Sequence, residues 1–150
     1  MAATIWNPVV RTSIAARAQQ VSADAAPGWG KMNAAAMMAH INDALRMALG
    51  ELPVKSKNLP LRYKPIRTLF IYYLPMPKGA PTAPELIARC PNAVLEDEKR
   101  AFAELIDRVA AVTPGAAMAP HPAFGDLSYE EYGALIAKHT DHHLRQFGVW

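Results

Sequence analysis

Apolar residues recur every three or four positions in four long stretches of the chain, which is the spacing of one face of an α-helix. Residues that commonly bound helices stand at the ends of these stretches, among them Asn7 followed by Pro8, Asn33, and Pro114 followed by Gly115. We therefore predict four long helices. Their expected ranges are residues 7–20, 34–49, 95–112 and 128–147.

The last of these predicted helices carries histidines on its inward face. Ser128 and Glu131 have the spacing of a capping box, which indicates that the helix starts there. At about 100° per residue, one face combines apolar with polar positions. Its members are Tyr132, Leu135, Ile136, His139, His143, Gln146 and Phe147. Since a polar side chain facing a core must be satisfied, His139 and His143 are the most informative residues of this face.

The second predicted helix has a broad apolar side formed by Met37, Ile41, Ala44, Leu45 and Ala48. His40 lies at the edge of that side. We expect Asn42, Asp43 and Arg46 to lie on the opposite, solvated side. The third helix has a similar apolar stripe, made by Phe102, Leu105, Ile106 and Val109.

Residues 51–91 have a different character, because eight of the 13 prolines fall there. Proline at this density prevents a long regular helix. A short helix is expected near residues 65–73, with Leu69, Phe70 and Tyr73 packing inward. A connection of this length allows the second and third helices to run parallel. The sequence thus predicts an all-α fold, a four-helix bundle with a long Pro-rich crossover, as a single domain over residues 1–150.

Composition narrows the functional classes. With 51% hydrophobic and 19% charged residues, the chain has a globular composition. The net charge is +3, and seven basic against two acidic residues lie in the crossover. No long basic run is present, so nucleic-acid binding is not expected. We find no secretion signal and no apolar segment of about 18 residues, so no membrane partner is expected. The single cysteine, Cys90, favours a reducing, cytoplasmic location and is interpreted as an incidental thiol.

The pair His139 and His143 suggests a metal site. Residues four apart on a helix lie one turn apart on the same face, so both imidazoles can reach one ion. A site needs at least a third ligand, with an open position if it is catalytic. His40 supplies this ligand if the second and fourth helices are neighbours. The alternative is that these are hydrogen-bonded core histidines without a metal.

The segment His139-Thr-Asp-His142-His143-Leu-Arg-Gln146-Phe147-Gly148 resembles the H-x-x-x-H-x-x-Q motif in the last helix of the DinB-like (YfiT-like) metalloprotein superfamily. His40 matches the upstream histidine of that superfamily. Further stretches are similar to one bacterial subgroup of it. They are Trp29-Gly-Lys-Met, Leu61-Arg-Tyr-Lys-Pro, Pro77-Lys-Gly-Ala-Pro-Thr-Ala-Pro and His121-Pro-Ala-Phe-Gly.

The resemblance implies an up-down-down-up four-helix bundle. It also implies a divalent metal, nickel, zinc or iron, held by His40, His139 and His143 with water completing the shell. Second-shell or pocket roles are considered for His121, His142 and Gln146. Each has a simpler alternative: loop packing for His121, a surface position for His142, and a helix-end polar residue for Gln146.

Some members of the superfamily are thiol transferases that join bacillithiol, mycothiol or glutathione to electrophiles. We therefore expect a metal-dependent enzyme, such as a thiol S-transferase or a hydrolase, in which a metal-activated thiolate or water attacks an electrophile. Its expected partner is a small molecule, such as an anionic low-molecular-weight thiol drawn to the basic crossover. The alternative is a non-catalytic metal-binding or stress-response protein with a structural ion. The apolar end 147–150 could pack on a second copy, so a homodimer is considered.

Overall fold

A computed structural model describes residues 2–150, and this part of the chain is all-helical, without a β-strand. The long helices are α1 (Pro8–Gln19), α2 (Ala34–Ala48), α4 (Leu95–Ala110) and α5 (Tyr129–Gln146). Shorter helical turns follow α2 in the crossover: η1 (Pro60–Arg62), α3 (Lys64–Thr68), η2 (Leu69–Tyr73), η3 (Pro84–Leu86) and η4 (Cys90–Asn92). Of the helices within residues 2–150, none is both long and apolar enough to cross a lipid bilayer.

The four long helices lie where the sequence predicts them. At three of them, the capping residues make the expected hydrogen bonds to backbone N–H groups. The Asn7 side chain accepts a hydrogen bond from the backbone N–H of Val9. The Asn33 side chain accepts one from Ala36. Ser128 and Glu131 form both halves of the capping box. Each contact satisfies an N–H group that has no partner inside its helix, and so fixes where the helix starts.

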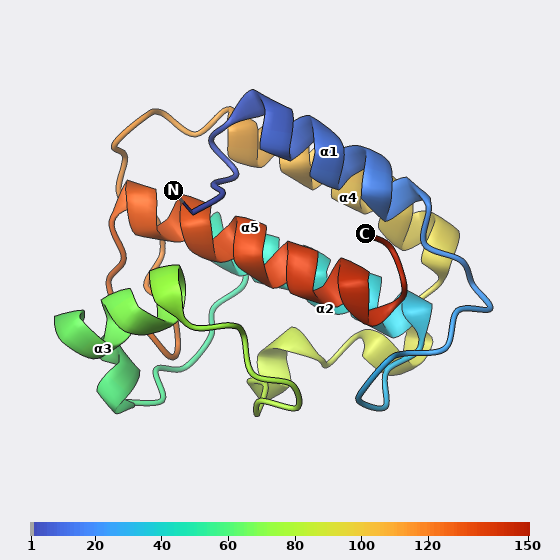
Figure 1. Ribbon diagram of the computed structural model, residues 1–150, viewed down its shortest axis with the longest axis horizontal. Coiled ribbons are helices and arrows are strands. Elements are labelled where there is room, and N and C mark those ends of the chain that lie inside the picture. Colours follow the sequence, from blue (N-terminus) through green and yellow to red (C-terminus); the bar gives the residue numbers. More distant parts are fainter. Residues whose placement is uncertain (1) are drawn as a thin grey trace.

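The long helices pack on one another around a shared core. α2 contacts α4 and α5, and α1 contacts the same two helices. In Figure 1, α1 and α5 run in one direction, whereas α2 and α4 run in the other. The inward stripe predicted for α4 is confirmed, since its four residues are all buried. The core is therefore built from faces that the hydrophobic spacing predicts.

The polar side predicted for α2 is wrong at two positions. Asn42 is 0% exposed and Asp43 is 4% exposed, although both were expected to face solvent. The reason is that α2 contacts α4, α5, η3 and η4 and therefore has little solvated surface. Asn42 and Asp43 are instead held by hydrogen bonds and ion pairs to other elements.

The short helix expected near residues 65–73 is present, but its inward face differs from the prediction. Leu69 and Tyr73 are exposed, and the buried residue is Ile71. Residues 64–68 form an α-helix and residues 69–73 continue as a π-helical turn. A π-helical turn has more residues per turn than an α-helix, so side chains after Thr68 point in directions that the α-helical wheel does not predict.

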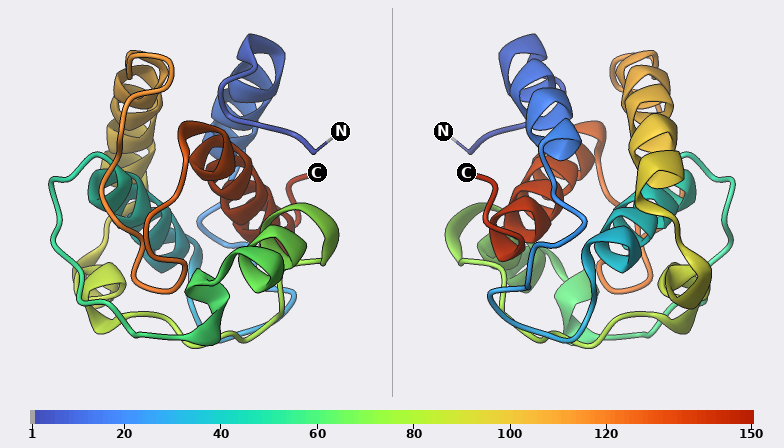
Figure 2. Two further views of the ribbon diagram at one scale, coloured as in Figure 1. Left: turned by 90° about the vertical axis from the view of Figure 1, so that its left-hand side faces the viewer. Right: turned by 90° about the vertical axis from the view of Figure 1, so that its right-hand side faces the viewer.

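The crossover lies across α2 and α5 on the side away from α1 and α4, as both end-on views in Figure 2 show. Its contacts with the long helices are polar as well as apolar. Arg67 forms an ion pair of 2.8 Å with Glu131 on α5. The Lys138 ammonium donates to the carbonyl of Phe70 at 2.6 Å and so caps the end of η2. The crossover therefore forms a fixed wall beside α2 and α5.

The N-terminal segment packs closely on α5 at Gly133. The Trp6 ring stacks on Tyr129 with ring centroids 4.1 Å apart, and its indole N–H donates to the Tyr129 carbonyl at 2.7 Å. The backbone N–H of Ile5 donates to the Gly133 carbonyl. A Cβ atom at position 133 would lie 2.2 Å from the Trp6 indole nitrogen. This close approach requires a glycine inside α5.

Candidate metal centre

Three histidines from two helices converge in the structure. His40 comes from α2, and His139 and His143 come from successive turns of α5. One ring nitrogen from each lies within 4.8 Å of the others. His40 and His143 are buried, with exposed fractions of 3% and 9%, and His139 is partly exposed. The helical spacing of four and the contact between α2 and α5 together produce this three-histidine cluster.

A backbone carbonyl of the crossover sets the tautomer of His40. Nδ1 of His40 lies 3.0 Å from the carbonyl oxygen of Leu86 in η3. A carbonyl can only accept, so Nδ1 carries the proton and donates it. In the neutral ring Nε2 then has a free lone pair, and this atom lies 3.0 Å from Nε2 of His139. His40 thus points an unprotonated nitrogen into the cluster.

Gln146 sets the tautomer of His143 in the same way. The Gln146 amide nitrogen donates to the Trp29 carbonyl at 2.8 Å. This contact orients the amide so that its oxygen faces His143, where Oε1 lies 2.7 Å from Nδ1. Nδ1 of His143 therefore carries the proton, and Nε2 is left unprotonated. Such outer hydrogen bonds are typical of metal-ligating histidines.

The environment keeps all three imidazoles neutral. Burial lowers the pKa of His143 to about 3. The pKa of His139 is lowered well below its usual 6.5 by burial and by the neighbouring His143 and His40. Burial also lowers the pKa of His40, against opposing effects of the Leu86 hydrogen bond and the Asp43 carboxylate. Because metal ligation needs neutral imidazole, the cluster is ready to bind near neutral pH.

The donor atoms fit a first-row metal ion. Two nitrogens bonded to zinc at about 2.0–2.1 Å lie roughly 2.8–3.4 Å apart for ligand angles between a right angle and the tetrahedral value. The 3.0 Å separation of the His40 and His139 nitrogens falls within this range. Both tautomers fixed by Leu86 and Gln146 leave the nitrogen that faces the cluster free to ligate.

The cluster opens into a cavity of about 600 Å³. The cavity lies among α2, α5, the crossover and the loop before α5, and most of its lining is apolar. Apolar lining residues include Ile41, Leu45, Leu59, Phe70, Phe124 and Leu135. Within the described chain, no aspartate or glutamate contributes to the lining, and the charged lining residues are Lys31 and Lys57. The polar groups that face it are chiefly imidazoles.

The other two histidines lie near the cluster but outside it. His142 is half-buried and packs its ring at 5.0 Å from the Trp29 ring. His121 lines the cavity, yet its Nδ1 accepts hydrogen bonds from the N–H groups of Ala123 and Phe124 at 3.0 and 3.3 Å. His121 thus makes loop-packing contacts, and Gln146 is hydrogen-bonded to His143 and to the Trp29 carbonyl.

Sequence reasoning missed the backbone partners of the site. The carbonyls of Leu86 and Trp29 hold His40 and Gln146, and nothing in the identity of a residue marks its carbonyl as a partner. Arg89 is a further omission. It bridges Asp43 and Glu98 beside His40. The one available signal was the pair of polar residues, Asn42 and Asp43, on an otherwise apolar α2.

Fold and site define an all-helical protein in which three neutral imidazoles converge beside an apolar cavity, an arrangement that could hold a metal ion. Comparison with protein families agrees with this class. The DinB superfamily matches residues 12–147, and the chain belongs to this superfamily. Searches of curated proteins and of solved structures returned no significant match.

Proposed function

We propose that the protein is a metal-dependent enzyme in which His40, His139 and His143 hold a divalent ion. The observation that carries the proposal is the convergence of three imidazole nitrogens within 4.8 Å at the wall of a large cavity. A bound divalent ion would lower the pKa of a coordinated thiol or water and so supply a nucleophile at neutral pH. The reaction proposed is conjugation of a thiol to an electrophile: the thiol loses its proton, and its sulfur bonds to the electrophilic atom as the leaving group departs or a multiple bond opens. The alternative reaction is a related hydrolysis, with water in place of the thiol.

The donor set supports nickel, zinc or iron as the ion. Imidazole nitrogen suits these metals, whereas magnesium and calcium prefer oxygen ligands. The cluster has three nitrogen donors and no carboxylate among them. Three neutral ligands leave the full charge of a divalent ion in place, and no acidic side chain of the described chain lines the cavity. An anionic group, such as a thiolate, is therefore the favoured additional ligand.

The cavity supports a small molecule with an apolar body as substrate. Its volume of about 600 Å³ lies within the range of ligand pockets. Lys31 and Lys57 are the lining residues with positive charge. Lys78 lies nearby, 4.6 Å from the centre of the Trp29 ring. We propose that these lysines attract the anionic group of a low-molecular-weight thiol, and that the apolar wall accepts the electrophile.

The packing of the long helices supports the bundle expected for the superfamily. α2 and α4 run in the same direction, opposite to α1 and α5 (Figure 1). We propose that the four helices form an up-down-down-up bundle, with the crossover as the long connection that parallel neighbours require. In such a bundle the site lies between facing helices, here α2 and α5.

A non-catalytic protein with a structural ion is the second candidate. The observation in its favour is that the cluster joins residues 99 positions apart on two helices, so an ion there would tie them together. The cavity favours catalysis, because a purely structural site is normally closed by protein ligands.

Metal content tests the assignment. Wild-type protein expressed with nickel, zinc or iron should hold about one ion per chain, measured by elemental analysis. His40→Ala, His139→Ala and His143→Ala should each lose it, because each removes one of three ligands. His142→Ala is the matched control, since His142 lies on the same helix outside the cluster and should leave the metal in place. Full occupancy in all three ligand variants would refute the site.

Activity then separates the two candidates. Metal-loaded protein should conjugate a low-molecular-weight thiol to an apolar electrophile, and His143→Ala should not. Leu59→Trp adds bulk to the cavity wall from the crossover, and Leu59 is on a different element from the three clustered histidines. If the protein is an enzyme, this variant should keep its metal and lose turnover. A metal-loaded wild type without turnover on any thiol–electrophile pair would favour the structural ion.

A further inference from the structure

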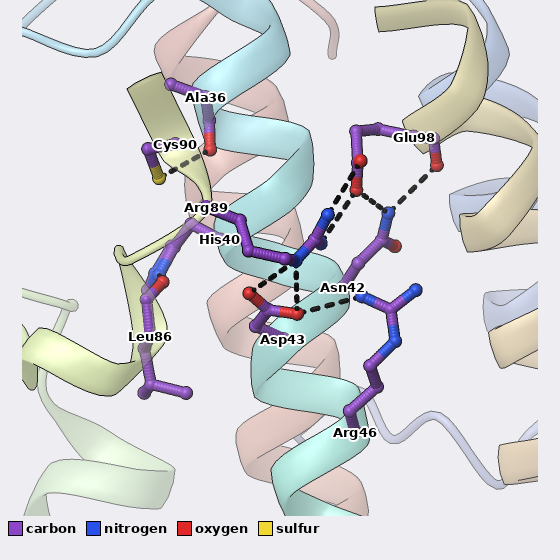
Figure 3. Close-up of polar contacts among 9 residues, drawn as sticks. All are labelled: Ala36, His40, Asn42, Asp43, Arg46, Leu86, Arg89, Cys90 and Glu98. Carbon is purple, nitrogen blue, oxygen red and sulfur yellow. Dashed lines mark hydrogen bonds and ion pairs between the residues drawn. The ribbon is translucent and has the colours of Figure 1, made fainter. Parts of the chain in front are cut away.

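An ion-pair network that joins two buried carboxylates to one exposed arginine lies beside His40 (Figure 3), and its residues do not line the cavity. At its centre is Arg89, between η3 and η4. Its guanidinium donates to both oxygens of Asp43 on α2, at 3.0 and 3.1 Å. It also donates to both oxygens of Glu98 on α4, each at 3.0 Å. One arginine of the crossover thus joins two long helices, and we call this group the Arg89 network.

The carboxylates of this network depend on Arg89. Asp43 is 4% exposed and Glu98 is 6% exposed. A buried carboxylate is costly unless it is paired, and bidentate arginine contacts are the strongest of such pairs. Asn42 donates to Glu98 as well, and Arg46 donates to Asp43 at 2.8 Å. Both carboxylates are therefore paired through Arg89, whereas the buried Oδ1 of Asn42 has no hydrogen-bond partner among the described residues.

The same network fixes the segment that contacts His40. Leu86, whose carbonyl accepts from Nδ1 of His40, lies three residues before Arg89. The next residue, Cys90, donates its thiol to the Ala36 carbonyl at 3.3 Å. Burial raises the pKa of this thiol, which keeps it protonated as a donor. Two neighbouring residues thus attach the segment to α2.

The two attachments lie on either side of His40. Ala36 is four residues before His40 and Asp43 is three residues after it, so each lies about one helical turn away. The segment that carries Leu86 is therefore attached to α2 about one turn before His40 and about one turn after it. These two attachments restrict the movement of the Leu86 carbonyl. Figure 3 shows Leu86, Arg89 and Cys90 along the same side of α2 as His40.

We propose that Arg89 is a positioning residue for the metal centre: it holds the Leu86 carbonyl against Nδ1 of His40 and thereby selects the tautomer whose Nε2 is free to ligate. The effect on metal binding rests on the proposed function. The effect on the tautomer does not, since it needs only the hydrogen bond between Nδ1 of His40 and the Leu86 carbonyl.

Arg89→Met is the variant that tests the proposal, because methionine fills the space without the guanidinium. The first readout is the tautomer of His40 in metal-free protein, observed by nitrogen NMR of the imidazole. Wild type should have the proton on Nδ1, and Arg89→Met should populate both tautomers. The second readout is the dissociation constant for zinc. Loss of an outer-shell partner typically weakens metal binding by about 10–100-fold, which is the loss expected here.

Arg46→Met is the matched control. The Arg46 side chain also pairs with Asp43, at 2.8 Å, but it makes no hydrogen bond or ion pair with the crossover segment. Its loss should leave the His40 tautomer unchanged. It should change zinc affinity by less than about threefold, because the Arg46 side chain does not hold the segment that contacts His40. Loss of a group that does support a metal ligand typically costs about 10–100-fold. If Arg46→Met matches Arg89→Met in both readouts, the network acts only through general stability and the proposal is wrong.

Arg89→Lys covers the case in which Arg89→Met does not fold. Lysine keeps the charge but cannot make bidentate contacts with two carboxylates. It should fold and show an intermediate tautomer population and zinc affinity. A wild-type tautomer with wild-type affinity in this variant would overturn the proposal. If wild type binds no zinc at all, the proposed function fails, and the tautomer readout still tests the role of Arg89.

Discussion

His121 uses its ring nitrogens in the opposite way from the clustered histidines. In His40 and His143 Nδ1 donates to an oxygen. In His121 Nδ1 accepts from the N–H groups of Ala123 and Phe124, so it must be unprotonated. Burial lowers the pKa of His121 to about 4. Protonation would remove this acceptor and open the loop that lines the cavity.

His121 should make the free energy of unfolding depend on pH. Its pKa is about 4 in the folded protein and near 6.5 when unfolded, so between these values the unfolded chain binds more protons. Stability is then complete above about pH 6.5 and is lost as pH falls toward about 4. In His121→Asn, the side-chain oxygen replaces Nδ1 as acceptor and does not titrate. The unfolding free energy of metal-free protein, from urea titrations across this range, should fall less steeply in the variant.

The other histidines titrate in both proteins, so the difference between the two profiles isolates His121. Parallel profiles would show that His121 does not contribute to the pH dependence.

At the residue scale, the sequence predicts the side chains of the cluster better than their partners. His139 and His143 follow from helical spacing, and His40 follows from its place at the edge of the apolar side of the second helix, provided that this helix lies beside the last one. The roles of Leu86 and Trp29 could not be predicted, because it is their backbone carbonyls that accept the hydrogen bonds from His40 and Gln146. Every residue has such a carbonyl, whatever its side chain. Arg89 lies in a Pro-rich stretch without a helical period, so the pattern gave no position for its side chain.

At the element scale, the sequence of α5 reflects both its own hydrophobic pattern and the N-terminal segment that packs against it. Most of the helix follows its hydrophobic pattern, and the face predicted to be inward is largely buried. Gly133 interrupts it for steric reasons, because the Trp6 ring occupies the space of a side chain. Glycine normally weakens a helix interior by about 1 kcal/mol relative to alanine. Its presence here indicates that packing of the N-terminal segment outweighs helix propensity.

Gly133→Ala should therefore destabilise the protein, although alanine is the better helix former. Overpacking a tight contact typically costs about 1–3 kcal/mol, which exceeds the gain of roughly 1 kcal/mol in propensity. Chemical denaturation should give a net loss of up to about 2 kcal/mol. In a Thr4→Ala/Trp6→Ala background both the indole ring and the Thr4 hydroxyl that would meet this Cβ are absent, and the same substitution should be neutral or stabilising. A loss of equal size in both backgrounds would contradict the steric explanation.

The long helices could be predicted because both their periodicity and their caps are local properties. Their bounds in the structure differ from the predicted ones by no more than two residues. The π-helical turn could not be predicted, because its extra residue per turn is an adjustment to packing on α5, where Lys138 caps its end. For the same reason the burial of Ile71 was missed.

At the scale of the whole molecule, the crossover is part of the site. Its sequence suggested an irregular basic excursion, yet it supplies the Leu86 carbonyl, Arg89 and much of the cavity wall. Its attachments to the long helices are ion pairs and carbonyl contacts between residues far apart in the chain. Such contacts depend on the tertiary fold, so they cannot be predicted from hydrophobic spacing.

The distance between the clustered histidines along the chain has a thermodynamic consequence. His40 and His139 are 99 residues apart, so only the folded protein gathers all three ligands. An ion that binds the folded state alone adds stability by mass action, about 1.4 kcal/mol for each tenfold rise in free ion above the dissociation constant. The thermal midpoint of wild type and His142→Ala should rise with free zinc, and that of His143→Ala should not. The working stability of this protein is then a function of metal supply as well as of its sequence.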